Sequence, residues 1–332
     1  MRGPVAATVA SAVLLAGCTD AEPEPIHQVY PASTTPPATS PAAPAAPASS
    51  ATAPAALLPP ADPEDVRVRT AMEAVRQLAG DIGPRPGTSA AYRRAASWVE
   101  RRLGALGWTV ERQRFHTPAG VSWGVPVPAG PSLNLVATRG DVRLGRPWLL
   151  VGAHLDTVPQ APGAEDNASG VGVLLAAAEA LAGHRTRLPV VLVAFGSEEP
   201  RGPGDADHHY GSMAYVASLT PQQQRSLRGM VALDRVGVGA VVPVGSPVPD
   251  GLVRDDPVAD DLVREGRRAG VPTTFSSGER SSDHWSFARA GLPGVRLGST
   301  PYAAYHSAAD VPSVVDPAQL ERTARLVVAW LR

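Results

Sequence analysis

Short, nearly continuous apolar runs alternate along the chain with segments of helical periodicity. The apolar runs lie at 148–153, 190–195 and 230–233, and such runs are typical of strands that are covered on both faces. The segment 169–182, between the first two runs, is rich in Ala, Val and Leu and ends before Gly183, which predicts a connecting helix. Alternating strands and helices predict an α/β sheet that is largely parallel.

Three further elements are predicted at the two ends of this pattern. Apolar residues share one helical face between Tyr92 and Leu106, and Gly107 is a plausible helix stop. The segment 108–115 alternates like a strand. Asp316 and Pro317 begin a last helix, whose apolar side carries Leu320, Ala324, Val327 and Leu331.

The N-terminus has the pattern of an export signal. Arg2 precedes an apolar run, 5–15, which is too short to span a bilayer because a spanning helix needs about 20 residues. Residues 14–18, LLAGC, resemble a bacterial lipobox, in which the cysteine is lipidated. We therefore expect a lipoprotein signal peptide over residues 1–18, with a lipid on Cys18 as the membrane anchor. The alternative is an ordinary signal peptide and secretion.

Residues 19–61 consist mainly of Ala, Pro, Ser and Thr. Such a segment has too little bulky apolar surface to offset its chain entropy, so we expect a disordered linker. The folded domain is then residues 62–332, one large domain.

The net charge argues against nucleic-acid binding, and the cysteine count limits the possible cross-links and metal ligands. The chain of 332 residues has 30 basic and 31 acidic side chains and a formal net charge of -1, so no global field attracts nucleic acid. Cys18 is the one cysteine, which excludes an internal disulfide and a thiolate zinc site.

Polar side chains follow each of the three apolar runs. His154 and Asp156 follow the first run, Glu198 and Glu199 the second, and Asp234 the third. Ligands of parallel sheets collect beyond the carboxyl ends of the strands. Charged carboxylates gathered there are costly unless a cation neutralises them.

Asp166 and His306 complete a set of nitrogen and oxygen donors that suits zinc, with cobalt or manganese as substitutes. A helix cap at Asp166 and a loop histidine at His306 are the structural alternatives. If Asp166 bridges, His154 with Asp234 and Glu199 with His306 hold two ions about 3.5–4 Å apart. Glu198 is then free to act as a general base, and Asp156 can accept the other ring N–H of His154.

The segments that contain these candidate residues resemble the di-zinc aminopeptidases of metallopeptidase family twenty-eight. The motifs GAHLDTVP, GAEDNASGVGVLL, AFGSEE, ALDRVG and YHSAAD occur in the order of that family. The resemblance implies two Zn²⁺ per chain, with the same ligand pairs, Asp166 as the bridge and Glu198 as the base. It also implies a single-domain exopeptidase fold, with a mixed, mainly parallel β-sheet flanked by helices on both faces. The segment between Asp234 and His306 is too short for the dimerisation domain of a related family, so we prefer the single-domain relatives. We also expect a monomer.

The chain departs from the family in one segment. The insertion PRGPGDADHHY separates the glutamate pair from Gly211. Its His208 and His209 could touch substrate or metal, but we expect an exposed loop.

The segment Ser282-Asp283-His284, with Phe287, resembles a family segment that lines the substrate side. Asp283 and His284 are therefore expected to be pocket residues. Arg280 is expected to stabilise an anion in the reaction, and Tyr305 to help hold the oxyanion.

The resulting hypothesis is a metal-dependent aminopeptidase acting on peptides with a free N-terminus. A hydroxide that bridges the two zinc ions would attack the carbonyl carbon, and Glu198 would carry the proton to the leaving amine. The alternatives are a carboxypeptidase or dipeptidase on the same site, a glutaminyl cyclase relative with one zinc, and a surface module without catalysis.

Overall fold

The computed structural model describes residues 58–139, 145–249 and 256–332. The predicted signal peptide, Cys18 and residues 19–57 of the predicted linker lie outside this part of the chain. All described residues belong to one unit, Ala55–Arg332. Among them, no helix has the length and apolar character that crossing a bilayer requires.

A mixed eight-stranded sheet forms the centre of the unit, in the order β1-β4-β6-β5-β7-β10-β8-β9. The four central strands are parallel, β8 and β9 are parallel to each other, and the β1-β4, β4-β6 and β10-β8 pairs are antiparallel. The strands are β1 (Thr109–Thr117), β4 (Gly130–Thr138), β5 (Trp148–His154), β6 (Val190–Phe195), β7 (Leu227–Asp234), β8 (Val242–Gly245), β9 (Thr273–Ser276) and β10 (Gly294–Gly298). A separate hairpin joins β2 (Gly120–Ser122) to β3 (Val125–Val127).

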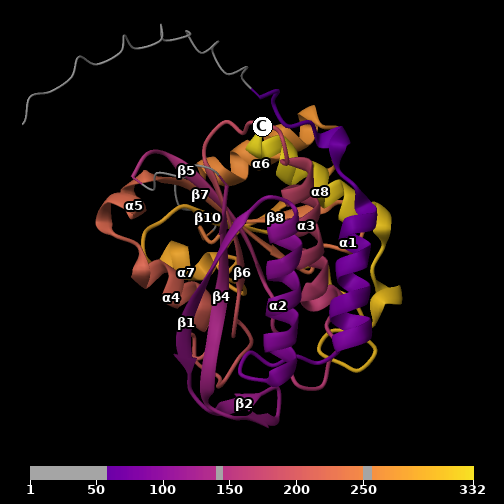
Figure 1. Cartoon of the computed structure of the whole chain (residues 1–332), viewed down its shortest axis with the longest axis vertical. Helices are drawn as coiled ribbons and strands as arrows, with labels where there is room; N and C mark the ends of the chain where they lie inside the picture. The colour runs from indigo at the N-terminus through magenta and orange to yellow at the C-terminus, as the bar shows by residue number, and fades with distance from the viewer. Residues whose placement is uncertain (1–57, 140–144, 250–255) are drawn as a thin grey trace, which may run out of the picture. The chain divides into compact units, whose positions relative to one another are not determined.

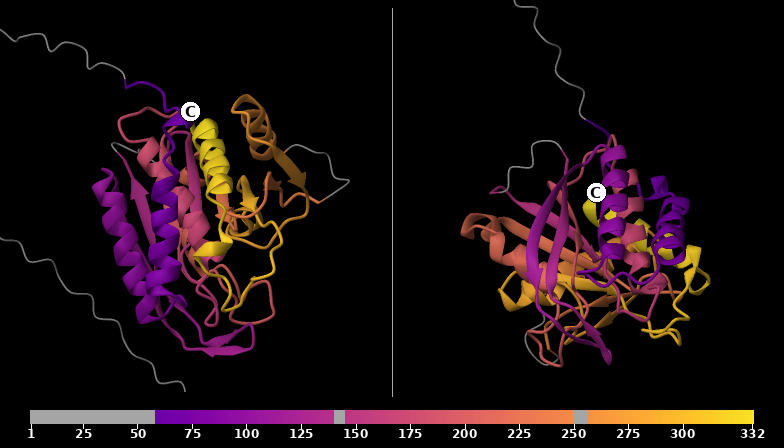
Figure 2. Two further views of the ribbon diagram at one scale, coloured as in Figure 1. Left: turned by 90° about the vertical axis from the view of Figure 1, so that its right-hand side faces the viewer. Right: turned by 60° about the horizontal axis from the view of Figure 1, so that its bottom comes forward.

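Helices cover both faces of the sheet (Figures 1 and 2). One layer contains α1 (Val68–Val75), α2 (Ala90–Ala105), α3 (Gly170–Ala180), α6 (Pro257–Arg268) and α8 (Pro317–Leu331), whose buried residues share one apolar cluster. The other layer contains α4 (Tyr210–Ser218) and α7 (His284–Arg289), beside α5 (Pro221–Ser226). The predicted fold class is confirmed.

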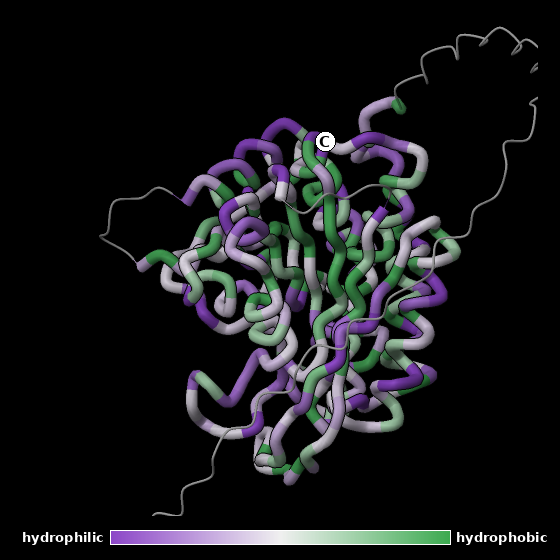
Figure 3. The backbone as a smooth tube through the Cα atoms, turned by 60° about the vertical axis from the view of Figure 1, so that its left-hand side comes forward, coloured by the Kyte–Doolittle hydropathy of each residue, from purple (hydrophilic) through white to green (hydrophobic). Residues whose placement is uncertain are grey.

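The central strands divide their side chains between the two layers. Leu149 and Val151 of β5 pack in the cluster with α3, whereas Trp148 and Leu150 pack in the cluster with α4. All four are fully buried. This two-sided burial explains why the strand reads as a continuous apolar run, and Figure 3 shows hydrophobic segments running through the middle of the unit.

The predicted helix ends agree with local capping. Ser89 caps α2 by accepting a hydrogen bond from the N–H of Tyr92, and Gly107 follows the helix with a φ of 84°. Asp316 caps α8 through the N–H of Ala318. The strand expected at 108–115 is β1, and the helix expected at 169–182 is the shorter α3.

Ordered structure begins before the predicted domain boundary at Asp62. Pro60 forms a β-bridge with Arg185, and the N–H of Ala61 donates to the Arg185 carbonyl at 3.1 Å. Ala61 is fully buried. Residues 60 and 61 therefore belong to the folded unit, because a segment of Ala and Pro can dock through its backbone without bulky side chains.

Candidate metal centre

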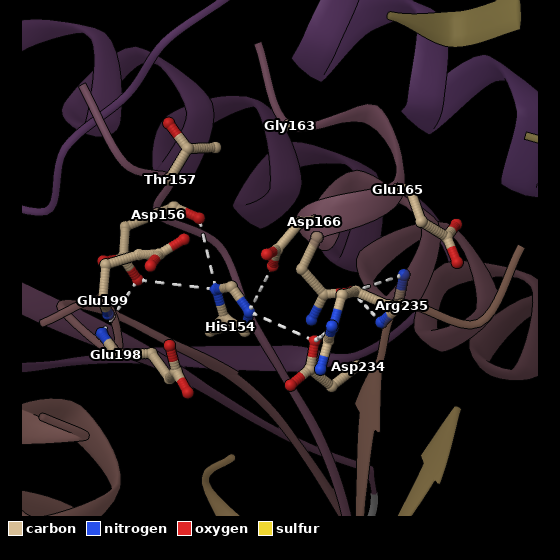
Figure 4. Close-up of polar contacts among 12 residues, drawn as sticks. His154, Asp156, Thr157, Gly163, Glu165, Asp166, Glu198, Glu199, Asp234 and Arg235 are labelled. Atoms are coloured by element: carbon tan, nitrogen blue, oxygen red, sulfur yellow. Dashed lines mark hydrogen bonds and ion pairs between the residues drawn. The ribbon is translucent and has the colours of Figure 1, made fainter. Parts of the chain in front are cut away.

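Five side chains from separate elements converge at the carboxyl ends of the central strands. His154 is the last residue of β5 and Asp234 the last of β7, while Glu199 follows β6. Asp166 lies within η3 (Ala164–Ser169), where its own backbone is not helical, with φ -111° and ψ 85°. His306 lies in the segment after β10. Figure 4 shows the carboxylates of Asp166 and Asp234 both in contact with one ring nitrogen of His154.

Asp166 presents one carboxylate oxygen to each histidine. Its Oδ1 lies 3.2 Å from His154 Nε2, and its Oδ2 lies 3.0 Å from His306 Nε2. Asp234 Oδ1 is 3.6 Å from His154 Nε2, and Glu199 Oε2 is 3.7 Å from His306 Nε2. The five residues thus form two groups that share Asp166.

Left-handed backbone conformations occur at His306 and at neighbours of two other candidate residues. Ser197, Arg235 and His306 all have φ values in the left-handed region, at 52°, 55° and 53°. Residues other than glycine are uncommon there, and they concentrate at functional sites because the surrounding structure must hold them.

Buried polar atoms in the cluster fit a cation. Glu199 and Asp234 are 5% and 3% exposed, yet Glu199 Oε1 and Asp234 Oδ1 have no hydrogen-bond partner among the described residues. Donor atoms within 4.8 Å of one another group His154 with Asp166 and Glu199, and His154 with Glu198 and Asp234. Buried carboxylate and imidazole donors in this number suit zinc.

Burial and neighbouring charges shift the pKa values of the clustered carboxylates and of His154. Burial raises the pKa of Glu199 well above its ordinary value, and the charges of Asp166 and Glu198 add to this effect. Burial acts in the same direction on Asp166, but contacts with histidines outweigh it and lower that pKa. Burial opposes protonation of His154, but Glu198, Asp166 and Asp234 raise its pKa well above the usual range. A divalent cation would replace these shared protons as the source of positive charge.

Asp156 has a different contact from the one expected. Its Oδ1 lies 3.8 Å from His154 Nδ1, too far for a hydrogen bond, whereas its backbone oxygen lies 3.2 Å from that nitrogen. The carboxylate instead accepts the backbone N–H groups of Glu198 and Glu199, at 3.0 and 3.2 Å. Asp156 therefore fixes the backbone of the glutamate pair, because the turn after β6 brings these N–H groups to it.

Two supporting residues were missed by sequence reasoning. The carboxylate of Asp310 accepts the backbone N–H groups of Glu165 and Asp166, at 2.8 and 3.1 Å. The fully buried Arg85 donates to the carbonyls of Leu155 and Gly163, at 2.7 and 3.1 Å. Asp310 ends the motif YHSAAD, which is the one sequence signal for it, whereas Arg85 lies outside the motifs named above.

The expectation that His209 is exposed was wrong. His209 is 6% exposed, and its Nε2 lies 3.1 Å from Glu198 Oε1. The insertion returns to the site because the N–H of His209 donates to the Glu198 carbonyl at 2.9 Å. His208 is partly buried and, like His209, lines the cavity above the cluster.

A cavity of about 350 Å³ opens above the five residues. Arg280 and Tyr305 line it, as expected, and Tyr305 stacks on His306 with ring centroids 3.7 Å apart. Trp123, from the β2-β3 hairpin, also lines the cavity and meets His306 edge-on at 4.4 Å. Sequence reasoning missed Trp123, because its segment shows no periodic pattern.

Asp283 and His284 differ from the expected pocket residues, because they are not among the residues that line this cavity. They are 1% and 0% exposed. His284 Nε2 instead pairs with the backbone oxygen of Glu279 at 2.9 Å. Burial raises the pKa of Asp283 to about 7, and the charge of Glu198 adds to this shift.

Comparisons with known proteins agree with this architecture. Residues 134–331 match the model of peptidase family M28. The chain is 30% identical over 187 residues to the uncharacterized protein YfbL of Escherichia coli K12, covering 54% of this chain and 52% of that protein. It is 29% identical over 243 residues to leupeptin-inactivating enzyme 1 of Streptomyces exfoliatus, covering 70% and 49%. The chain thus spans about half the length of these curated relatives.

Two solved structures show the same fold. A zinc aminopeptidase from Bacillus subtilis is 17% identical, with a TM-score of 0.69 over 80% of this chain and 94% of that one. The glutaminyl cyclase of Porphyromonas gingivalis is 20% identical, with a TM-score of 0.68 over 80% and 98%. Since the family model matches more than half of the sequence, the chain belongs to peptidase family M28.

Proposed function

We propose that the chain is a zinc-dependent aminopeptidase that removes N-terminal residues from peptides. The observation that carries the proposal is the placing of Asp166 between His154 and His306, with one carboxylate oxygen toward each ring. A relative adds support, since an aminopeptidase of Pseudomonas aeruginosa is 36% identical over 109 residues, which cover 31% of this chain and 18% of that protein.

The five residues would hold two zinc ions. His154 and Asp234 would bind one ion, Glu199 and His306 the other, and Asp166 both. When bound, zinc lowers the pKa of a water molecule and polarises the carbonyl group of the substrate.

Glu198 has the position of a general base. It lines the cavity beside the candidate ligands and is 7% exposed. Its carboxylate would accept a proton from the attacking water as the new C–O bond forms. It would then return that proton to the departing amine as the C–N bond breaks. Tyr305 offers a phenolic donor at the same cavity for the carbonyl oxygen.

Carboxylates beside the candidate metal ligands favour an amino terminus. The six acidic residues of the cavity lining outnumber Arg235 and Arg280, and Arg235 is already 3.6 Å from the carboxylate of Asp234. Two zinc ions would cancel this excess of four negative charges. The contact to a protonated amine would then come from carboxylates that bind no ion, Glu198, Asp205 and Glu279.

The test combines metal content with three peptide sets, assayed with and without chelator. We expect two zinc ions per chain and release of the first residue from peptides that are free or amidated at the C-terminus. Acetylation of the N-terminus should abolish this release. Cleavage of acetylated peptides from the C-terminus would support a carboxypeptidase, and ammonia release from N-terminal glutamine with one zinc would support a glutaminyl cyclase. A metal-free chain without turnover would support a surface module.

We also propose that the protein is an exported monomer, anchored by a lipid on Cys18. In a bacterial host, labelled fatty acid should enter the full-length protein but not the Cys18→Ser variant. Label in both proteins would overturn the proposal.

A further inference from the structure

We infer that His209 is a positioning residue that fixes the carboxylate of Glu198, a role that no family motif assigns. The inference rests on the proposed function, because it concerns the general base of that reaction. The residues that carry it belong to the insertion PRGPGDADHHY and to the turn after β6.

The two side chains form a buried pair. His209 Nε2 lies 3.1 Å from Glu198 Oε1, with side-chain exposures of 7% and 10%. A neutral imidazole protonated at Nε2, or an imidazolium, donates a hydrogen bond to Oε1 in this geometry. The second carboxylate oxygen, Oε2, is then the one available for the proton of the attacking water.

Glu198 is held at its backbone as well. Its N–H donates to Asp156 Oδ1 at 3.0 Å, and its carbonyl accepts the N–H of His209 at 2.9 Å. A neighbouring bond, from the N–H of Tyr210 to the carbonyl of Ser197 at 3.0 Å, extends this pairing. His209 thus contacts the glutamate at both the main chain and the carboxylate, and these two contacts restrain the side chain of the base.

The insertion that carries His209 is tied to the rest of the molecule. Arg201 donates to the carbonyl of Pro128 at 3.1 Å, and its N–H donates to the Asp207 carbonyl at 2.8 Å. Trp285 donates to Asp205 Oδ2 at 3.3 Å. The contacts on both sides of the insertion make it an ordered arm.

The backbone of His209 adds a second observation. Its φ is 59°, in the left-handed region, immediately before α4. A residue with a Cβ is strained there. Glycine would relieve the strain but would lose the imidazole that reaches Glu198.

The chemical consequence concerns kcat more than KM. Without the donor, the carboxylate can rotate and present the wrong oxygen to the attacking water, while the candidate zinc ligands keep their own contacts. Partners of this kind are typically worth about 10- to 100-fold in activity. We therefore expect His209→Ala to lower kcat by about 10- to 100-fold, with a nearly unchanged KM and zinc content.

Two variants separate positioning from folding. His209→Gln places an amide N–H at a reach similar to that of Nε2, so we expect it to recover much of the lost kcat. His116→Ala is the control, because His116 is exposed on β1 and lies outside the cavity lining. It should keep most of the kcat.

A spectroscopic measurement gives a readout besides activity. In ¹H–¹⁵N spectra of the imidazole groups, the signals of His209, assigned by their loss in His209→Gln, should move in the Glu198→Gln variant of the zinc-loaded protein. The His208 signals should move less.

The outcomes distinguish the inference from the proposed function. If Glu198→Gln is inactive while His209→Ala keeps its kcat, the positioning role is wrong and the proposed function stands. The same conclusion follows if the His209 signals do not shift in Glu198→Gln. Loss of kcat in His209→Ala with equal loss in His209→Gln and His116→Ala would also overturn it. If Glu198→Gln remains active, the proposed general base itself fails.

Discussion

Asp310 holds the backbone of Asp166 in place: its Oδ2 accepts the N–H of Asp166 at 3.1 Å, while its Oδ1 accepts the N–H of Glu165 at 2.8 Å. Tyr302 donates its hydroxyl to the same carboxylate at 3.0 Å. Asp310 is fully buried. The orientation of the proposed bridging carboxylate therefore depends on a second acid that lies outside the ligand set.

Asp310→Asn is expected to weaken zinc binding about 10- to 100-fold. Asparagine can accept only one of the two N–H groups with its oxygen, and its NH₂ group faces the other. Competition with a chromogenic chelator measures the affinity. Asp316→Asn, which changes the exposed cap of α8, is the control and should leave zinc affinity unchanged. Equal affinities in all three proteins would show that Asp310 does not position Asp166.

Glu198→Gln and Asp166→Asn should differ in their effect on zinc content. Glu198→Gln removes the proton acceptor but none of the five candidate ligands, so we expect full zinc content with a kcat lower by roughly 10²- to 10⁴-fold. Asp166→Asn removes the charge placed between the two histidines, so we expect incomplete zinc loading. Elemental analysis beside a peptide assay measures both. Near-normal turnover in Glu198→Gln, or full zinc in Asp166→Asn, would contradict the assignments.

Trp123 is expected to bind part of the peptide. Its side chain is 56% exposed at the cavity, beside the edge of His306. Trp123→Ala should raise KM for peptides with aromatic residues about fivefold, because an aromatic pair contributes about 1 kcal/mol, with kcat and zinc content nearly unchanged. Val121→Ala, on the same hairpin and outside the cavity lining, should leave KM unaltered. A KM that responds equally to both changes would show that the hairpin acts only through its shape.

The convergence of His154, Glu199 and Asp234 could be predicted from the sequence for a physical reason. Each follows an apolar strand, and the carboxyl ends of parallel strands meet at one edge of a sheet. The start of α8 could also be predicted, because Asp316 caps the helix by accepting a hydrogen bond from the N–H of Ala318, two residues further along the chain.

Long-range contacts explain what the sequence did not predict. His209 belongs to an insertion rich in Gly, Pro and Asp, and its buried position depends on backbone bonds to Ser197 and Glu198. The last two strands at one side of the sheet, β8 and β9, are only four residues each and carry partly exposed positions, so they show no continuous apolar run. Asp283 looked like a pocket residue from its motif, but the packing of α7 buries it below the cavity.

His284 should make the metal-free protein less stable in acid. Burial lowers its pKa to about 3, and the hydrogen bond to the Glu279 carbonyl offsets only part of this effect, whereas in the unfolded chain the value is about 6.5. Between these two values the unfolded chain binds a proton that the native protein does not bind. The contribution of His284 to stability is therefore fully present above pH 6.5 and is lost as the pH falls toward 3, by roughly tenfold in the unfolding equilibrium constant for each pH unit.

Urea unfolding of the chelator-treated wild type and of His284→Gln, followed between pH 7 and 4.5, measures this contribution. Glutamine keeps an N–H for the Glu279 carbonyl but does not titrate, so the stability of the variant should fall less steeply with decreasing pH. By pH 4.5 the unfolding equilibrium constant of the wild type should have risen roughly 100-fold more than that of His284→Gln. Parallel curves would mean that His284 is charged in the native protein, or that acid opens α7 before the rest of the unit unfolds. Hydrogen exchange of the α7 amides at pH 4.5 separates these cases, because only local opening exposes them while the central strands stay protected.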